Sequence, residues 1–298
     1  MLVLFNHPPS DFSEAALGIG ATSRRDVGMA KREGKCVKTP VALTVAGSDS
    51  GGGAGVQADL KTFAALGVYG LSAITALTAQ NTAEVTRVLD VPADMVAAQI
   101  DAVLGDFGAQ AAKTGMLASA PIVEVVAERL AAHGVTNLVV DPVMVAKSGT
   151  LLLREDGIAA LKRLLLPLAI VVTPNIPEAE VLTGRKIVGR EDLYDAAREI
   201  LAMGSRNVVL KGGHAEGDAV DIFYDGKDWR EYSAARLLTP HTHGTGCTFS
   251  AAIAAFLARG YGVEEAVTAA KGFITNAIRH GLPLGHGHGP VNQFPWVS

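Results

Sequence analysis

Residues 241–260 read HTHGTGCTFSAAIAAFLARG, and this stretch decides how the chain is organised. Its start, Gly244-Thr245-Gly246, carries too little side chain to form a core, and from Cys247 onward helix-forming residues follow without a break. A glycine loop that leads into a helix leaves backbone N–H groups unpaired at the helix N-terminus, and the helix dipole adds positive potential there. We therefore expect an anion site here, with the Cys247 thiol where its field is strongest.

Short apolar runs alternate with helical patterns through the rest of the chain. Residues 41–46 predict a buried strand, 51–55 a glycine loop and 55–67 a helix with one apolar face. Further strands are expected at 71–77, 87–91, 111–116, 138–141, 170–173, 207–210, 220–224 and 229–232, and further helices at 92–105, 121–134, 155–166, 177–182, 191–203, 247–259 and 263–280. This alternation predicts an α/β fold of three layers (α/β/α), with a mostly parallel central sheet and helices on both faces.

The composition limits the possible functions. Hydrophobic residues make up 49% of the 298 residues and charged residues 19%, which favours a large core over disorder. The formal charge of -4 offers no basic surface for nucleic acid, and no apolar run approaches the ~20 residues that span a membrane. Two cysteines cannot form a disulfide framework, so a cytoplasmic location is expected. Residues 1–39 show no hydrophobic period, which predicts an unstructured extension before a single domain at 40–298.

Glycine and polar residues collect where the expected strands end, and ligands of parallel α/β sheets bind beyond the carboxyl ends of the strands. The segments concerned are 47–55, 80–81, 113–116, 141–144, 173–178, 211–214 and 243–247. The chain lacks the G-x-x-x-x-G-K-[ST] sequence of P-loop proteins, so a phosphate cradle would have to be 244–247. The alternative for that segment is a helix cap with a buried, inert cysteine.

Several side chains at these strand ends suit phosphoryl transfer. Asn175 and Glu178 could face one site across Pro177, and an amide with a carboxylate suits Mg²⁺ held largely through water. The alternative for Glu178 is a first-turn acid that complements a helix dipole. Lys211 follows a strand beside two glycines, where its ammonium could meet a phosphate; the alternative is a solvated surface lysine. His243 is expected to neighbour the phosphate rather than to bind a transition metal, because the His-x-His pairs lie in loops without a nearby acid.

Residues 53–58, GAGVQA, fit the G-x-G-x-x-A fingerprint of dinucleotide binding, which follows a strand and opens a helix. That fingerprint needs an acid about 20 residues further on to hold the ribose, but the second expected strand ends in Ala79-Gln80-Asn81. A nicotinamide-dependent oxidoreductase is therefore disfavoured.

Seven segments together resemble one enzyme family. They read AGSDSGGGAGVQADLKTF at 46–63, TALTAQNT at 75–82, KTGML at 113–117, DPVMVAKSG at 141–149, TPNIPEAEVLTG at 173–184, VVLKGGH at 208–214 and HTHGTGCTFSAA at 241–252. In their order and spacing they resemble the hydroxymethylpyrimidine/phosphomethylpyrimidine kinases, thiamine-pathway enzymes of the ribokinase-like superfamily. The resemblance runs from about residue 41 to residue 294.

The resemblance implies two successive ATP-dependent phosphorylations. The first is of the hydroxymethyl group of 4-amino-5-hydroxymethyl-2-methylpyrimidine, and the second converts the monophosphate to the pyrophosphate. It also implies ATP and Mg²⁺ as cofactors and a homodimer. Some relatives carry Glu at the position of Gln80, whose amide keeps hydrogen bonds to the ring amine but brings no charge. The residues that the resemblance places around the pyrimidine are Gly47, Ala54, Asp59, Gln80, Met116 and Val143.

The mechanistic hypothesis makes Cys247 the acceptor of the substrate hydroxyl proton, helped by a pKa lowered at the helix N-terminus. The N–H groups of 244–247 would stabilise the charge on the transferring phosphoryl group, which assigns Gly244, Thr245 and Gly246 to the catalytic loop. The expected nucleotide contacts, which with Mg²⁺ neutralise the ATP phosphates, are Asn175, Glu178, Lys211, His243 and Thr245.

Two alternatives of function stay open. A pyridoxal or pyridoxine kinase of the same superfamily also phosphorylates a hydroxymethyl group on a small heteroaromatic ring. A non-catalytic protein that binds a B-vitamin intermediate is the second, although Asp59, Glu178, Lys211 and Cys247 favour an enzyme. Residues 145–149, with a glycine and a lysine, are a candidate flap over the substrate.

Overall fold

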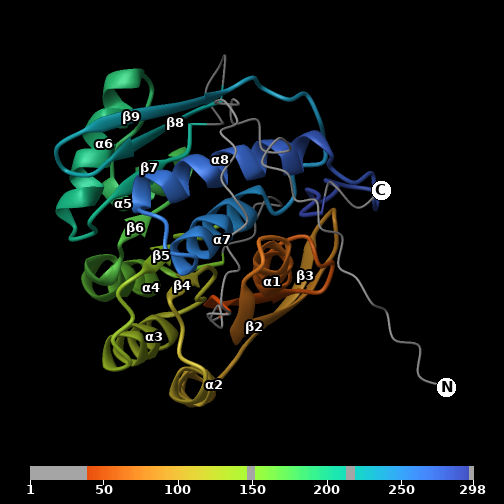
Figure 1. The fold of residues 1–298 in the computed structure, drawn as a ribbon, viewed down its shortest axis with the longest axis vertical. Helices are drawn as coiled ribbons and strands as arrows, with labels where there is room; N and C mark the ends of the chain where they lie inside the picture. Colours follow the sequence, from red (N-terminus) through yellow and green to blue (C-terminus); the bar gives the residue numbers. More distant parts are fainter. Residues whose placement is uncertain (1–38, 146–151, 213–218, 295–298) are drawn as a thin grey trace, which may run out of the picture. The chain divides into compact units, whose positions relative to one another are not determined.

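The computed structural model describes residues 39–145, 152–212 and 219–294 (Figure 1). These residues belong to one compact unit, Thr39–Ser298. All but Thr39 of the expected extension and all but Val145 of the expected flap lie outside the described residues. The division into an extension and a single domain over 40–298 therefore stays a prediction.

A mixed sheet forms the centre of the described structure. In chain order its strands are β1 Val41–Asp49, β2 Tyr69–Gln80, β3 Val85–Asp90, β4 Ala111–Thr114, β5 Leu138–Val140, β6 Val171–Val172, β7 Val208–Leu210, β8 Ala219–Tyr224 and β9 Trp229–Ala234. They are arranged in the order β3-β2-β1-β4-β5-β6-β7-β8-β9. The strands from β2 to β7 in that order are parallel, whereas β3, β8 and β9 pair antiparallel at the two edges. The expected mostly parallel sheet is confirmed.

Helices cover both faces of this sheet. They are α1 Gly55–Ala65, α2 Ala93–Asp106, α3 Ala120–Ala132, α4 Glu155–Ala160, α5 Ile176–Thr183, α6 Arg190–Ala202, α7 Thr245–Ala258 and α8 Val263–Arg279. One apolar core joins the sheet to α2–α6, and a second joins it to α1, α7 and α8 (Figure 1). Because side chains alternate along a strand, Leu43 and Val45 enter the first core and Ala42 the second. The three-layer architecture is confirmed.

Helix α7 lies at the centre of its layer. Its residues from Thr248 to Ala258 are all buried, and small alanines let it pack against β1, β4, β5, α1 and α8. This packing fixes the start of the helix at the carboxyl ends of the parallel strands. The helix begins at Thr245, two residues before the expected start at Cys247.

Two of the elements whose ends differ from expectation have a local physical reason. Strand β1 continues beyond residue 46 to Asp49, because Ser48 and Asp49 pair with β2 after a register shift. The helix expected at 155–166 is α-helical only to Ala160 and continues as a π-helical turn over Leu161–Leu165. It ends in a 3₁₀ turn that contains Pro167, since proline cannot donate the backbone hydrogen bond that would extend the helix.

Candidate active site

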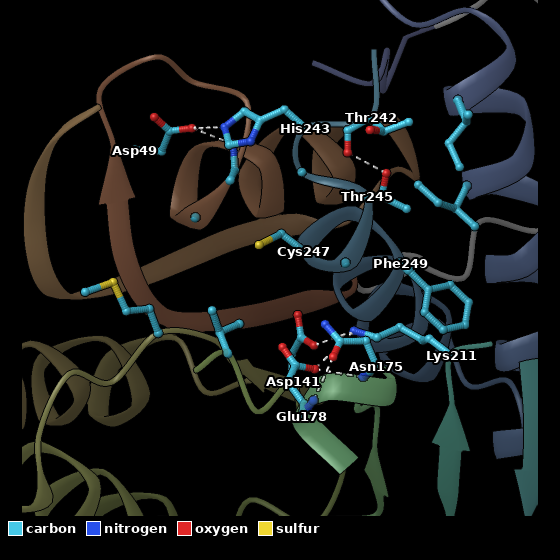
Figure 2. A pocket seen from close by; sticks show the side chains of 18 of the residues that line it. Asp49, Asp141, Asn175, Glu178, Lys211, Thr242, His243, Thr245, Cys247 and Phe249 are labelled. Carbon is cyan, nitrogen blue, oxygen red and sulfur yellow. Dashed lines mark hydrogen bonds and ion pairs between the residues drawn. The ribbon is translucent and has the colours of Figure 1, made fainter. Parts of the chain in front are cut away.

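A cavity of about 450 Å³ lies at the carboxyl ends of the parallel strands (Figure 2). Its walls come from β1, β2 and β4, from the segments after β5 and β7, and from α5, α7 and α8. The cavity therefore occupies the place where parallel α/β sheets bind ligands. The predicted site residues that line it are Gly47, Ala54, Gln80, Met116, Val143, Asn175, Glu178, Lys211, His243, Gly244, Thr245, Gly246 and Cys247.

The start of α7 lines the cavity with backbone rather than with long side chains. Gly244 is the N-cap residue, has a φ of 80°, and offers no side chain to cap the helix. A Cβ on Gly244 would overlap the carbonyl oxygen of Gly53, so two glycine loops pack backbone to backbone here. The Thr245 hydroxyl donates to the Thr242 carbonyl at 2.7 Å. First-turn N–H groups are thus left at the cavity wall, as an anion site requires.

A charged group lies beside this helix start. Lys211 Nζ is 2.9 Å from Asp141 Oδ1 and 3.9 Å from Glu178 Oε2, and a Cβ on Gly246 would lie 3.4 Å from the same ammonium. Burial alone would raise the pKa of Asp141, but the ammonium groups of Lys211 and Lys113, together with the hydrogen bonds from Lys211 and Ser250, outweigh burial and lower that pKa. The Lys211 side chain is 15% exposed. Lys211 is therefore an oriented ammonium in the cavity and not a solvated surface lysine.

Asn175 and Glu178 begin α5 and form its cap. The Asn175 side-chain oxygen accepts a hydrogen bond from the Glu178 N–H at 2.8 Å, and Glu178 Oε2 accepts one from the Asn175 N–H at 2.8 Å. The alternative of a first-turn acid is therefore realised for Glu178, and both residues also line the cavity. Burial raises the pKa of Glu178 to about 7, although Lys211 opposes the shift. A further cation close to this buried carboxyl group would therefore stabilise its ionised form.

The structure does not bear out the expected lowering of the Cys247 pKa. Burial raises that pKa to about 11, which outweighs the Lys113 ammonium and the hydrogen bond from the Gly55 N–H. The carboxylates of Asp59 and Asp141 add to the rise. The helix N-terminus does not compensate for this desolvation. Cys247 is thus a protonated thiol at neutral pH.

The structure places Asp59 behind the cavity wall, and its expected contact with the ring stays a prediction. The residue lies on α1, is 0% exposed and accepts a hydrogen bond from Thr44 Oγ1 at 2.6 Å. The Lys113 ammonium lies 2.9 and 3.0 Å from its two carboxylate oxygens. Asp59 is enclosed and paired and does not line the cavity, whereas its partner Lys113 does.

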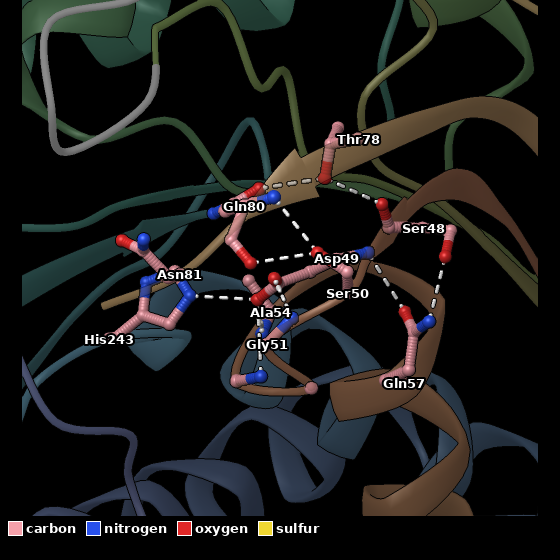
Figure 3. A network of polar contacts seen from close by, with 12 residues as sticks. Ser48, Asp49, Ser50, Gly51, Ala54, Gln57, Thr78, Gln80, Asn81 and His243 are labelled. Atoms are coloured by element: carbon pink, nitrogen blue, oxygen red, sulfur yellow. Dashed lines mark hydrogen bonds and ion pairs between the residues drawn. The ribbon is translucent and has the colours of Figure 1, made fainter. Parts of the chain in front are cut away.

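Part of the cavity wall suits a flat heteroaromatic ring. Gly47, Met116 and Val143 provide apolar walls. A Cβ on Gly47 would lie only 3.0 Å from the Met116 sulfur, so glycine leaves the room that the methionine needs. Gln80 ends β2, and its side-chain oxygen accepts a hydrogen bond from Thr78 at 3.2 Å (Figure 3). Two apolar surfaces and an amide are what an aminopyrimidine would need.

His243 is held by Asp49 in a polar network that joins two loops (Figure 3). His243 Nε2 lies 2.8 Å from Asp49 Oδ2, and the same carboxylate accepts hydrogen bonds from the N–H groups of Gly51, Gly53 and Ala54. Burial would raise the pKa of Asp49, but His243 and these N–H groups hold it below its usual range. Asp49 therefore connects the β1–α1 loop to the anion loop. It contacts Nε2 of His243, the residue that we expected to neighbour the phosphate.

The strand-end segments contain three charged residues of the site, Asp49, Lys113 and Asp141, to which sequence reasoning gave no individual role. All three line the cavity and are at least 98% buried. Each lies in or directly after an otherwise apolar, buried strand. A lone charge in such a strand is the signal that would have selected them, because a buried charge needs a partner or a ligand.

The fold and this site define a class of protein. A three-layer, mostly parallel sheet carries a glycine-rich anion loop at a helix N-terminus, and a lysine–carboxylate group faces the same cavity. These are the features of a small-molecule kinase of the ribokinase-like type, which binds phosphate without a P-loop.

The chain belongs to the phosphomethylpyrimidine kinase family, whose family model matches residues 49–292. The hydroxymethylpyrimidine/phosphomethylpyrimidine kinase of Rhizobium meliloti is 53% identical over 260 residues, which cover 86% of this chain and 97% of that protein. The thiamine biosynthesis bifunctional protein of Geobacter sulfurreducens is 54% identical over 253 residues and 85% of this chain. The match covers 52% of that relative, so the chain spans about half of its length.

A solved structure supports the same assignment. The ADP complex of Bacillus subtilis pyridoxal kinase matches with a TM-score of 0.81 and 41% identity, over 87% of this chain and 98% of that one. The resemblance read from the sequence is confirmed, and the chain is a phosphotransferase. The oxidoreductase and the non-catalytic binding protein are thereby set aside. No helix among the described residues is long and apolar enough to cross a membrane.

Proposed function

We propose that the protein phosphorylates 4-amino-5-hydroxymethyl-2-methylpyrimidine with ATP and then phosphorylates the monophosphate to the pyrophosphate, as a kinase of thiamine biosynthesis. The relatives named for these two activities support the substrate. One observation of this structure carries the proposal: a single cavity holds both a ring-sized apolar end and an anion loop.

The same cavity suits both reactions. In the first, the hydroxymethyl oxygen forms a bond to the γ-phosphorus while the bond from that phosphorus to the β,γ-bridging oxygen breaks, and ADP leaves. In the second, an oxygen of the monophosphate is the attacking atom. The first-turn N–H groups at Gly246 and Cys247 would stabilise the transferring group, and the Lys211 ammonium would neutralise charge on the ATP phosphates.

We assign Mg²⁺ binding to Glu178 and Asn175, largely through water. Within the described ranges no group of three or more His, Cys, Asp or Glu residues could hold a metal alone, so phosphates and water would supply most ligands. The buried Glu178 carboxyl, with its pKa raised to about 7, fits a neighbouring cation. Bound there, Mg²⁺ would offset the negative charge that builds on the departing ADP.

Cys247 is the proposed acceptor of the substrate hydroxyl proton. Its side chain lies at the start of the helix that carries the anion loop and lines the cavity (Figure 2). The Gly55 N–H stabilises the ionised form of the thiol. Because its pKa is raised to about 11, only the small thiolate fraction would take the proton. The reaction should accordingly be faster at higher pH.

Product analysis tests the proposed function directly. The protein is incubated with the pyrimidine alcohol and Mg-ATP, and the products are separated by anion-exchange chromatography and identified by mass. The monophosphate should form first and the pyrophosphate later, each with one equivalent of ADP. Absence of both products, in a protein that hydrolyses or transfers phosphate to another hydroxymethyl ring, would assign the site to another substrate.

A pyridoxal kinase is the second candidate, because a pyridoxal kinase is among the similar structures at 41% identity. Both rings carry a hydroxymethyl group, and the cavity could hold either. Gln80 suits the exocyclic amine of the pyrimidine, which pyridoxal lacks. A kcat/KM ratio above one for the pyrimidine over pyridoxal supports the first assignment, and a ratio below one supports the second.

The homodimer and the cytoplasmic location are part of the same proposal. Support for a dimer comes from exposed apolar residues on β2 and β3, where Leu77 and Leu89 are paired neighbours. The free thiol of Cys247 suits a reducing compartment. Light scattering after size-exclusion chromatography should give twice the chain mass; a monomer would remove the dimer from the proposal.

A further inference from the structure

The segment that follows α8 forms a closed loop (Figure 1). The Leu282 N–H donates a hydrogen bond to the Pro290 carbonyl at 2.8 Å, which joins the two ends of the loop. The Asn292 N–H then donates to the carbonyl of Ala277 in α8 at 3.0 Å. Residues 282–290, the glycine–histidine loop, are therefore a compact surface loop with fixed ends, a kind of loop that frequently has a function.

The end of the glycine–histidine loop holds the residue that precedes the anion loop. The His243 N–H donates to the Gly289 carbonyl at 3.0 Å, and the His243 carbonyl accepts from the Val291 N–H at 3.1 Å. The His243 ring is held separately, because its Nε2 lies 2.8 Å from Asp49 Oδ2. Gly244 follows directly in the chain. The glycine–histidine loop therefore fixes the backbone from which the anion loop starts.

The tip of the glycine–histidine loop lies against the turn between β2 and β3. The Gly287 N–H donates to Thr82 Oγ1 at 3.1 Å, and the His288 N–H donates to the Thr82 carbonyl at 2.9 Å. A Cβ on Gly285 or on Gly287 would lie 2.2 Å from an oxygen of Thr82, so this close approach needs glycine at both positions. Thr82 lies two residues after Gln80, which lines the cavity. The glycine–histidine loop thus joins the end of β2 to the anion loop.

The stability of the core does not explain the contact at the tip. Residues 283–288 are all exposed, so they bury little apolar surface, and hydrogen bonds that water can replace contribute little to folding. The chain is anchored further on, where Val291 and Gln293 are buried and the Gln293 amide donates to Thr248 Oγ1 in α7 at 3.0 Å. The contact between the tip and Thr82 therefore calls for another explanation.

We propose that the glycine–histidine loop sets the position of the anion loop relative to the end of β2, and that Thr82 and Gly287 are positioning residues which act on phosphoryl transfer through His243. The catalytic consequence rests on the proposed kinase function, whereas the hold on the anion loop does not. Gly244 caps α7 without a side chain, so the direction of the first-turn N–H groups depends on backbone contacts. Displaced N–H groups stabilise the transferring phosphoryl group less, which lowers kcat.

The first test measures the anion loop without substrate, by hydrogen exchange and mass spectrometry. Gly287→Ala places a methyl group against the Thr82 carbonyl at an exposed position. The peptide over 241–249 should then exchange about fivefold faster than in the parent protein, which corresponds to one weakened hydrogen bond. A peptide over α2 should not change. The matched control is Gly272→Ala, where a Cβ meets nothing within 4 Å, and it should speed exchange in neither peptide.

A second pair of variants isolates one hydrogen bond. Thr82→Val keeps the shape of the side chain but removes the oxygen that accepts from the Gly287 N–H, and it should speed exchange of the 241–249 peptide about threefold. Thr82→Ser restores the hydroxyl and should return the rate to that of the parent. Faster exchange that is confined to residues 281–294 in Gly287→Ala and Thr82→Val, with 241–249 unchanged, overturns the proposal.

Steady-state rates with Mg-ATP and the pyrimidine alcohol give the catalytic test. In Gly287→Ala, kcat should fall about fivefold while the KM of the pyrimidine stays within about twofold of the parent, because the anion loop acts on the transition state. An unchanged kcat overturns the proposal, and a raised KM beside it would assign the glycine–histidine loop to ring binding alone. Circular dichroism and a denaturant midpoint show that the compared proteins are folded. If even the parent does not phosphorylate the pyrimidine, the proposed function fails, while the exchange result still decides whether this loop holds the anion loop.

Discussion

The pH dependence of turnover is the sharpest consequence of the site. Burial raises the pKa of Cys247 to about 11, so the thiolate is about one molecule in a thousand at pH 8 and about one in a hundred at pH 9. The active form of a base is the deprotonated one, and it therefore gains with rising pH. If Cys247 accepts the hydroxyl proton, kcat should rise about tenfold for each pH unit between 7 and 10.

The assay is the initial rate of ADP formation at saturating Mg-ATP and pyrimidine alcohol, in overlapping buffers of constant ionic strength. The matched control is Cys247→Ser, which keeps the size and hydrogen bonding of the side chain but ionises far above this range. We expect a lower kcat in the serine variant and a nearly flat profile. Near-ultraviolet circular dichroism at each pH confirms that both proteins stay folded.

Two results would refute this reasoning. The first is a flat wild-type profile between pH 7 and pH 9, because a base with a pKa of about 11 cannot give it. The second is a serine variant with wild-type kcat. Either result would mean that the hydroxyl proton leaves on an oxygen of the transferred phosphoryl group. Cys247 would then serve as a neutral contact of the anion loop.

Three further predictions concern binding and stability. Gly244→Ala should lower the free energy of unfolding by about 3 kcal/mol or more, since its Cβ overlaps a facing carbonyl at positive φ. Gly260→Ala, also at positive φ but in open space, should cost only about 1 kcal/mol, as urea denaturation would show. Lys211→Met should reduce kcat/KM for ATP about a hundredfold or more while the fold is kept, and activity within tenfold of wild type would contradict its role. Asp221→Ala should cost about 3 kcal/mol because it removes a buried partner of a lysine, whereas the exposed Asp228→Ala should change stability by less than about 0.5 kcal/mol.

The parts of the fold that could be predicted from the sequence are those governed by local pattern. Apolar runs between glycine turns predicted the parallel strands, and the change from HTHGTG to an alanine-rich run predicted the buried helix α7. The strand-end rule then brought Asn175, Glu178, Lys211 and the anion loop to one cavity. Each of these inferences needs only the chain direction of a strand and the period of its side chains.

The parts that could not be predicted depend on what surrounds a charged group in space. The helix N-terminus at Cys247 favours a lower pKa, yet burial reverses the sign. Asp59 belongs to a segment that matches the family, but only the structure shows that Lys113 and Thr44 enclose it. Depth behind a cavity wall cannot be read from spacing along a helix.

The structure also changes the interpretation of the two glycine loops. In the sequence, residues 51–55 and 244–246 read as two separate glycine loops, and only the second is expected to cradle a phosphate. In the structure, Gly244 can only approach Gly53 because neither carries a Cβ, and Asp49 collects the N–H groups of one loop while it holds His243 of the other. The first loop therefore acts as the support of the second. Since the anion loop has no long side chain to fix it, its N–H groups stay aimed at the cavity only as long as this backbone contact and the Asp49–His243 pair hold it.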